Sequence, residues 1–173
     1  MNKVELLDDC KNSLGEGITY SSTNNFLYWL DIGNISKLHK LDLSSNKKKI
    51  FELPEIVTAT SIRSSDELIL ATNNGIKLFN TSNKKFESIL KIENQQLLTR
   101  SNDGASDSLG RFWFGTMQNN FDKNGIGIPI KENIGKLYKI DTNRKISIVE
   151  DGLGIPNTFV WSPDNKIFYF TDT

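Results

Sequence analysis

Residues 106–116 read S-D-S-L-G-R-F-W-F-G-T, in which a polar turn is followed by a short apolar run. Three other stretches have the same composition: Y-S-S-T-N-N-F-L-Y-W-L-D (20–31), I-R-S-S-D-E-L-I-L-A-T (62–72) and W-S-P-D-N-K-I-F-Y-F-T-D (161–172). Short runs rich in Ile, Phe, Tyr and Trp, bounded by Ser, Asp, Asn and Gly, are typical of β-strands. Helical periodicity is nearly absent, so the pattern predicts an all-β protein.

The four stretches are copies of one repeat. With Trp29, Leu70, Phe114 and Phe170 placed in register, the spacings between them are 41, 44 and 56 residues. A repeat of about 40–50 residues that is built from short strands predicts a β-propeller with one blade per repeat. Residues at the same position of successive blades then converge on a common axis.

Each of three repeats also contains two further strand-like runs. They lie at 37–43, 75–80 and 135–141, and at 47–53, 84–90 and 144–150. Together with the strand before each polar turn, they give four strands per blade. We therefore expect residues 1–173 to form one domain, an incomplete propeller of about three and a half to four blades.

Composition excludes several classes of function. The 21 Lys and Arg residues balance the 21 Asp and Glu residues, so no global basic field exists to hold nucleic acid or an anionic membrane. Cys10 is the single cysteine, so no intrachain disulfide can form. Neither a signal peptide nor a membrane-spanning run is evident. The sequence predicts a cytoplasmic protein without a nucleic-acid or membrane partner.

One segment departs from the repeat. Residues 118–133 read Q-N-N-F-D-K-N-G-I-G-I-P-I-K-E-N and lengthen a hairpin of the third repeat. A long loop of this kind is either a mobile cover at the mouth of an axial site or a tolerated surface insertion. The sequence leaves both interpretations open.

A polar residue recurs 12 or 13 positions before the aligned apolar residue of each repeat. These residues are Glu16, Thr58, Asn102 and Asn157. One carboxylate with amide oxygens is a ligand set for a hard cation such as Ca²⁺, Mg²⁺ or Mn²⁺. Arg100 precedes Asn102 by two residues and therefore returns to the same strand face. The alternative is that Asn102 and Glu16 are ordinary turn and loop residues.

Three motifs resemble those of the gluconolactonase/regucalcin (senescence marker protein) family. They are L-G-E-G (14–17), R-S-N-D-G-x-x-D-x-x-G-R-F-W-F-G-T-M (100–117) and I-P-N-x-x-x-W-S-P-D-x-K-x-x-Y-F-T-D-T (155–173). The resemblance covers essentially the whole chain. It implies a six-bladed propeller with one divalent cation at its axis, Ca²⁺, Zn²⁺, Mn²⁺ or Mg²⁺, and commonly the hydrolysis of sugar lactones.

The resemblance also implies roles for individual residues. Glu16 and Asn157 are similar to the metal ligands of the family. Arg100 and Asn102 are similar to its substrate-binding residues, and Asn102 also lies near the metal. Asp103 matches an aspartate that follows this asparagine, where support of the strand is as good an interpretation as contact with a ligand.

Two departures from the family pattern affect the expected activity. Thr158 replaces the usual glycine after the metal-binding asparagine, which would crowd the backbone there. No residue before Thr173 matches the family's remaining metal-binding aspartate, which is also its proposed general base, and about two blades are missing. We expect this chain to lack a catalytic base, to be inactive alone, and to self-associate through open propeller edges.

The leading functional hypothesis is a divalent-metal-dependent hydrolase that opens a small sugar lactone. In such a reaction the cation polarises the ring carbonyl and stabilises the developing oxyanion. The alternatives are an organophosphate or aryl-ester hydrolase, and a non-catalytic calcium-binding or interaction propeller. Whether the 173-residue chain is an enzyme by itself stays open at the level of sequence.

Overall fold

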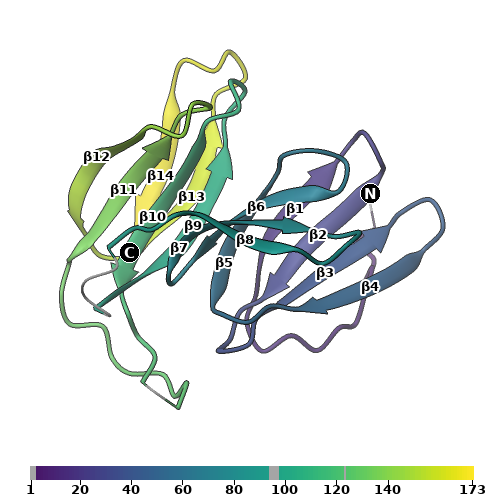
Figure 1. Ribbon diagram of the computed structural model, residues 1–173, viewed down its shortest axis with the longest axis horizontal. Coiled ribbons are helices and arrows are strands. Elements are labelled where there is room, and N and C mark those ends of the chain that lie inside the picture. The colour runs from purple at the N-terminus through teal and green to yellow at the C-terminus, as the bar shows by residue number, and fades with distance from the viewer. Residues whose placement is uncertain (1–2, 94–97, 123) are drawn as a thin grey trace.

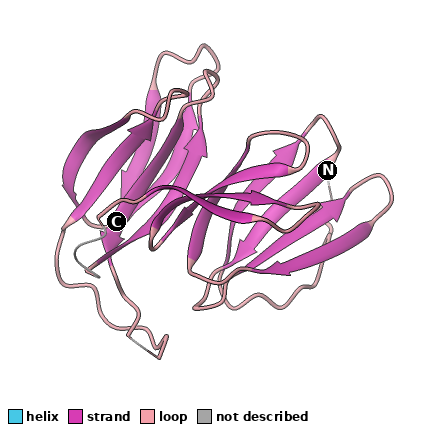
Figure 2. Cartoon of the chain, in the orientation of Figure 1, coloured by secondary structure: helices cyan, strands magenta, loops and turns pink. Residues whose placement is uncertain are grey.

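The computed structural model describes residues 3–93, 98–122 and 124–173. Within these ranges the secondary structure consists of strands and loops, without a helix (Figure 2). It follows that the described residues contain no helix long and apolar enough to cross a membrane. The prediction of an all-β protein is confirmed.

Fourteen strands form three four-stranded antiparallel sheets and one two-stranded sheet. The first sheet contains β1 (Gly15–Ser21), β2 (Phe26–Asp31), β3 (Lys37–Asp42) and β4 (Lys47–Glu52). The second contains β5 (Val57–Ile62), β6 (Glu67–Thr72), β7 (Gly75–Asn80) and β8 (Phe86–Leu90). The third contains β9 (Thr99–Ser106), β10 (Phe112–Gln118), β11 (Gly135–Ile140) and β12 (Ile146–Leu153). The last contains β13 (Pro156–Trp161) and β14 (Phe168–Asp172). These sheets are three and a half propeller blades, as predicted.

The blades follow one another in chain order. In Figure 1 the first blade lies on the right, the third and fourth lie on the left, and the second lies between them. The first strand of each blade contacts the first strand of the next through side-chain hydrogen bonds. These bonds join Thr19 Oγ1 to Thr60 O (3.1 Å), Thr58 Oγ1 to Ser101 Oγ (2.7 Å), Ser61 Oγ to Ser106 Oγ (2.7 Å) and Asn102 Nδ2 to Pro156 O (3.1 Å). Strands β1, β5, β9 and β13 therefore line the inner side of the arc.

Apolar side chains fill the space between neighbouring blades. One cluster joins the first and second blades and includes Tyr28, Leu30 and Leu70. A second cluster joins the second and third blades and includes Phe112 and Phe114. Because sheet faces alternate along a strand, each blade contributes one set of residues to each neighbouring core.

The four aligned apolar residues all lie in the second strand of their blades, as predicted. In the first three blades they also pair equivalently with the third strand: Trp29 lies opposite His39, Leu70 opposite Lys77 and Phe114 opposite Tyr138. Against the innermost strand the register shifts at different points. Trp29 and Phe170 lie opposite the shift, whereas Phe114 pairs regularly with Gly104.

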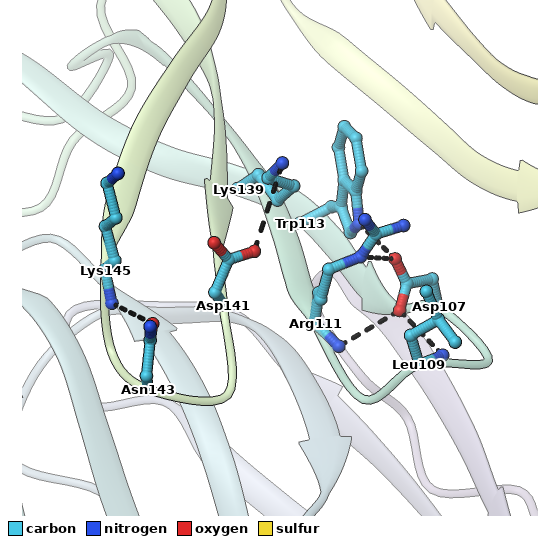
Figure 3. A network of polar contacts seen from close by, with 8 residues as sticks. All are labelled: Asp107, Leu109, Arg111, Trp113, Lys139, Asp141, Asn143 and Lys145. Atoms are coloured by element: carbon cyan, nitrogen blue, oxygen red, sulfur yellow. Dashed lines mark hydrogen bonds and ion pairs between the residues drawn. The ribbon is translucent and has the colours of Figure 1, made fainter.

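The turn between β9 and β10 is held by one carboxylate, that of Asp107 (Figure 3). It accepts hydrogen bonds from the backbone N–H groups of Leu109 and Arg111 (both 3.0 Å), from Arg111 Nε (2.5 Å) and from Trp113 Nε1 (2.8 Å). The Trp113 ring packs against Phe168 of the last sheet at 4.9 Å between centroids. This network therefore couples the turn to the docking of β13 and β14.

Candidate functional site

The predicted polar residues lie where the innermost strands break their regular pairing. The register with the second strand shifts between Glu16 and Thr19, between Val57 and Ala59, between Ser101 and Gly104, and between Asn157 and Val160. An extra residue in one strand of an antiparallel pair bends that strand and redirects its side chains. The same local distortion therefore recurs in all four blades at the height of the candidate site.

The structure brings Asn102 and Asn157 together, as their matched offsets predict. Asn102 Nδ2 donates to Asn157 Oδ1 at 3.0 Å and to the carbonyl oxygen of Pro156 at 3.1 Å. Only 7% of the Asn102 surface is exposed. Both amide protons of Asn102 are thus used in holding the start of β13.

Arg100 lies beside this pair, and its side chain is almost fully enclosed. It is 5% exposed, and its Nη1 donates to Ser101 O at 2.7 Å and to Asn102 Oδ1 at 3.2 Å. Burial lowers the pKa of Arg100 to about 10, and the charge of Glu16 opposes this shift. At neutral pH the guanidinium is therefore a fixed positive charge beside Asn102.

The long loop at 118–133 reaches the same place. Arg100 Nε donates to Asn120 Oδ1 at 2.8 Å, and the Arg100 guanidinium carbon lies 5.4 Å from the centre of the Phe121 ring. Phe121 also packs against the apolar cluster between the first two blades. Sequence reasoning did not identify Asn120 or Phe121 as site residues. The one available signal was the departure of this loop from the repeat.

Glu16 lies on the first blade and is influenced by charges of the third. Burial raises the pKa of the Glu16 carboxyl, the negative charge of Asp103 raises it further, and Arg100 lowers it. Among the described residues no hydrogen bond or ion pair satisfies this carboxylate. The Glu16 residue is nevertheless exposed, so its carboxylate is only partly shielded from water. A partly shielded carboxylate near a second negative charge is an environment that favours a bound cation.

Asp103 has both of its oxygens bound to backbone groups. Oδ1 accepts from Gly104 N at 2.8 Å and Oδ2 accepts from Thr158 N at 2.9 Å. Burial raises the pKa of Asp103, while these two hydrogen bonds lower it. This geometry agrees with the supporting role that was one of its two interpretations.

Thr58, the fourth aligned residue, contributes to packing between blades. Its buried hydroxyl donates to Ser101 Oγ at 2.7 Å. Within the described ranges, no group of three or more His, Cys, Asp or Glu side chains is placed to hold a metal ion. The predicted cation ligands, Glu16 and Asn157, stay a prediction, and they supply one carboxylate and one amide oxygen.

Comparisons with known proteins identify the family of the chain. Residues 14–173 match the model of the SMP-30/Gluconolactonase/LRE-like region. The chain is 29% identical to 6-deoxy-6-sulfogluconolactonase of Pseudomonas putida over 160 residues, which cover 92% of this chain and 52% of that protein. It is 28% identical to pentonolactonase of Haloferax volcanii over 165 residues, which cover 95% of this chain and 52% of that protein.

A solved structure gives the same result. The crystal structure of regucalcin from Agrobacterium tumefaciens, described as a calcium-binding protein, superposes with a TM-score of 0.84 at 28% identity. The superposition covers 96% of this chain and 53% of regucalcin. The chain thus spans about half the length of the relatives it matches. With its match over residues 14–173 and the shared fold, the chain belongs to the SMP-30/gluconolactonase/LRE-like family.

Proposed function

We propose that this chain carries part of the site of a divalent-metal-dependent hydrolase that opens small sugar lactones. The observation that carries the proposal is the hydrogen-bonded unit of Arg100, Asn102 and Asn157 on neighbouring inner strands. The Glu16 carboxylate, whose pKa responds to Arg100 and Asp103, completes the set. Lactone-opening relatives at 28% and 29% identity support the substrate class.

The donor set fits a hard divalent cation. Glu16 provides a carboxylate, and Asn157 Oδ1 accepts one hydrogen bond and so retains a second lone pair. When bound, the cation would act as a Lewis acid toward a lactone carbonyl. The negative charge of Asp103 adds to the attraction for the ion without the residue being a free ligand.

Arg100 is the residue best suited to hold the substrate. Its Nε and Nη1 are bound to Asn120, Ser101 and Asn102, and within the described residues no hydrogen bond uses Nη2. Two N–H donors are therefore left in a fixed orientation for a sugar hydroxyl. Asn102, in contrast, has committed both amide protons, so its contribution to substrate binding would be indirect.

We further propose that the chain alone does not turn over lactones. With two oxygen ligands from the protein, most coordination positions of the cation would be filled by water. Glu16 is the proposed cation ligand and Asp103 is bound to two backbone amides, so neither carboxylate is left to act as a general base. A second candidate function is cation binding without catalysis. The favouring observation is the likeness to regucalcin, a calcium-binding protein.

The test is a titration of the purified chain with Mn²⁺, Ca²⁺, Zn²⁺ and Mg²⁺ by calorimetry, together with an assay of gluconolactone opening. We expect weak binding that Glu16→Gln abolishes and that the control Glu52→Gln, on the exposed strand β4, leaves unchanged. The Pseudomonas putida relative serves as the positive control for the assay. Metal-stimulated turnover by the chain alone would contradict the proposed inactivity. Equal cation affinity in Glu16→Gln would exclude this metal site.

A further inference from the structure

Thr158 has a backbone conformation that a threonine rarely adopts. Its φ is 61°, in the left-handed region, and it directly follows Asn157. A β-branched side chain in this region is strained, and such a residue persists only when its surroundings hold it there. The other left-handed non-glycine residue of this blade is Asn165, in the turn before β14, where asparagine tolerates the conformation.

The backbone amide of Thr158 is bound from the neighbouring blade, whereas Thr171 of the same blade donates to Asn157 O at 3.2 Å and to Thr158 Oγ1 at 3.4 Å. Asp103 Oδ2 accepts a hydrogen bond from Thr158 N at 2.9 Å, while Oδ1 is fixed by Gly104 N at 2.8 Å. The backbone of Gly104 packs closely against β10, because a Cβ atom there would lie 2.6 Å from the carbonyl oxygen of Trp113. The Asp103 carboxylate is therefore oriented from the side of β9 by its hydrogen bond to Gly104.

Two consecutive side chains of β9 thus form hydrogen bonds with three consecutive residues of β13. Asn102 binds the carbonyl oxygen of Pro156 and Oδ1 of Asn157, and Asp103 binds the amide of Thr158. Asn157 lies between the two points of attachment. Its side chain can keep its direction only if the backbone on both sides is fixed.

We propose that Asp103 is a positioning residue that holds Thr158 in the left-handed conformation and thereby fixes the side chain of Asn157 toward the axis. The inference rests on the proposed function only in treating Asn157 as a cation ligand. Without the carboxylate, the strain at Thr158 drives the segment toward ordinary extended backbone and carries Asn157 away from Asn102. A glycine at position 158 has no such strain. The Asn157 side chain should therefore keep its direction in that variant even without the hydrogen bond to Asp103.

The test compares Asp103→Ala, Thr158→Gly and the double variant by nuclear magnetic resonance of the 173-residue chain. The readout is hydrogen exchange at the side-chain amide of Asn102, which is bound to Asn157 Oδ1. We expect exchange to accelerate about tenfold in Asp103→Ala, the equivalent of about one hydrogen bond. It should return close to the wild-type rate in Asp103→Ala/Thr158→Gly. The matched control Asp103→Ala/Asn165→Gly should show no recovery.

Two outcomes would overturn the proposal. One is unchanged exchange in Asp103→Ala, and the other is a double variant that stays as fast as Asp103→Ala. If Asp103→Ala does not fold, Thr158→Gly alone still decides. It should raise the folding equilibrium constant about threefold, because the relief of strain exceeds the added backbone entropy of glycine, and a decrease would refute the argument.

A Mn²⁺ titration of the same variants separates this inference from the proposed function. If Asn157 is a ligand, affinity should fall about tenfold in Asp103→Ala and recover in the double variant, as expected for a residue that orients a metal ligand. Should the wild type bind no Mn²⁺, the proposed metal site fails, while the exchange data still decide whether Asp103 positions Asn157.

Discussion

Replacement of Asp107 by alanine tests whether one turn supports the docking of the last blade. The substitution removes an acceptor of four hydrogen bonds, two from backbone amides, one from Arg111 and one from Trp113. Hydrogen bonds to a charged group contribute about 1.5–3 kcal/mol each, but not additively. The Arg111 side chain is 33% exposed and can be hydrated, so its bond contributes least. We expect a loss of about 3–5 kcal/mol in the free energy of unfolding.

The effect should spread from the turn to the site. Trp113 loses its hydrogen-bond partner, and its ring packs against Phe168 and Trp161 with centroids 4.9 Å and 6.1 Å away. Strands β13 and β14, which carry Asn157, should therefore lose protection against backbone hydrogen exchange before the first two blades do. A loss of about 3–5 kcal/mol is large against the ~5–15 kcal/mol of a typical domain.

Urea unfolding followed by circular dichroism measures the change, with Asp42→Ala as the matched control. Asp42 holds a comparable turn, accepting from Ser44 N (2.8 Å), Ser45 N (3.2 Å) and Ser45 Oγ (2.6 Å), but on an exposed hairpin. The control should lose much less stability because water can replace the lost acceptor. Equal losses in the two variants would show that burial of Asp107 and its contact with Trp113 do not matter.

Three further predictions follow from burial and charge. Burial would raise the pKa of Asp107, but hydrogen bonds from Trp113 and Arg111 outweigh it, so this pKa is lowered from 3.8. The wild type should therefore lose stability as pH falls below 3.8. The free energy of unfolding measured as a function of pH should show this loss, and Asp107→Asn should show less of it. The pKa of Glu16 is raised from 4.5 in the folded chain, so the ionised carboxylate at pH 7 opposes folding. In the absence of a cation, Glu16→Gln should therefore be as stable as the wild type at pH 7, or slightly more stable. Urea unfolding at pH 7 checks this, and clear destabilisation would contradict it. Finally, Ile18 on one open blade face is 71% exposed and Tyr169 on the other is 52% exposed, so we expect self-association, which Ile18→Lys should weaken. Light scattering after size exclusion tests this, and a monodisperse wild-type monomer would refute it.

The blades are the part of the fold that the sequence alone predicts. Polar turns alternate with runs such as Phe112–Gln118, and their repetition indicates strands, their number and their order, because alternation and turn chemistry are local properties. The register against the innermost strand was not predictable in this way. Trp29 lies opposite the shift in pairing beside Glu16, whereas Phe114 pairs regularly with Gly104, because the point at which the pairing shifts depends on how the strands meet.

The same division applies to the candidate site. The matched offsets of Asn102 and Asn157, with Arg100 two residues before Asn102, predicted three residues that the structure joins by hydrogen bonds. The contacts of Asn120 with Arg100 and of Asp103 with Thr158 were not predictable, since each joins segments 20 or more residues apart whose approach depends on the packing of strands and blades. Repeat position determines which residues can face the axis. Only the tertiary structure determines which of them touch, because hydrogen bonds form over distances that a shift of one residue in register would break.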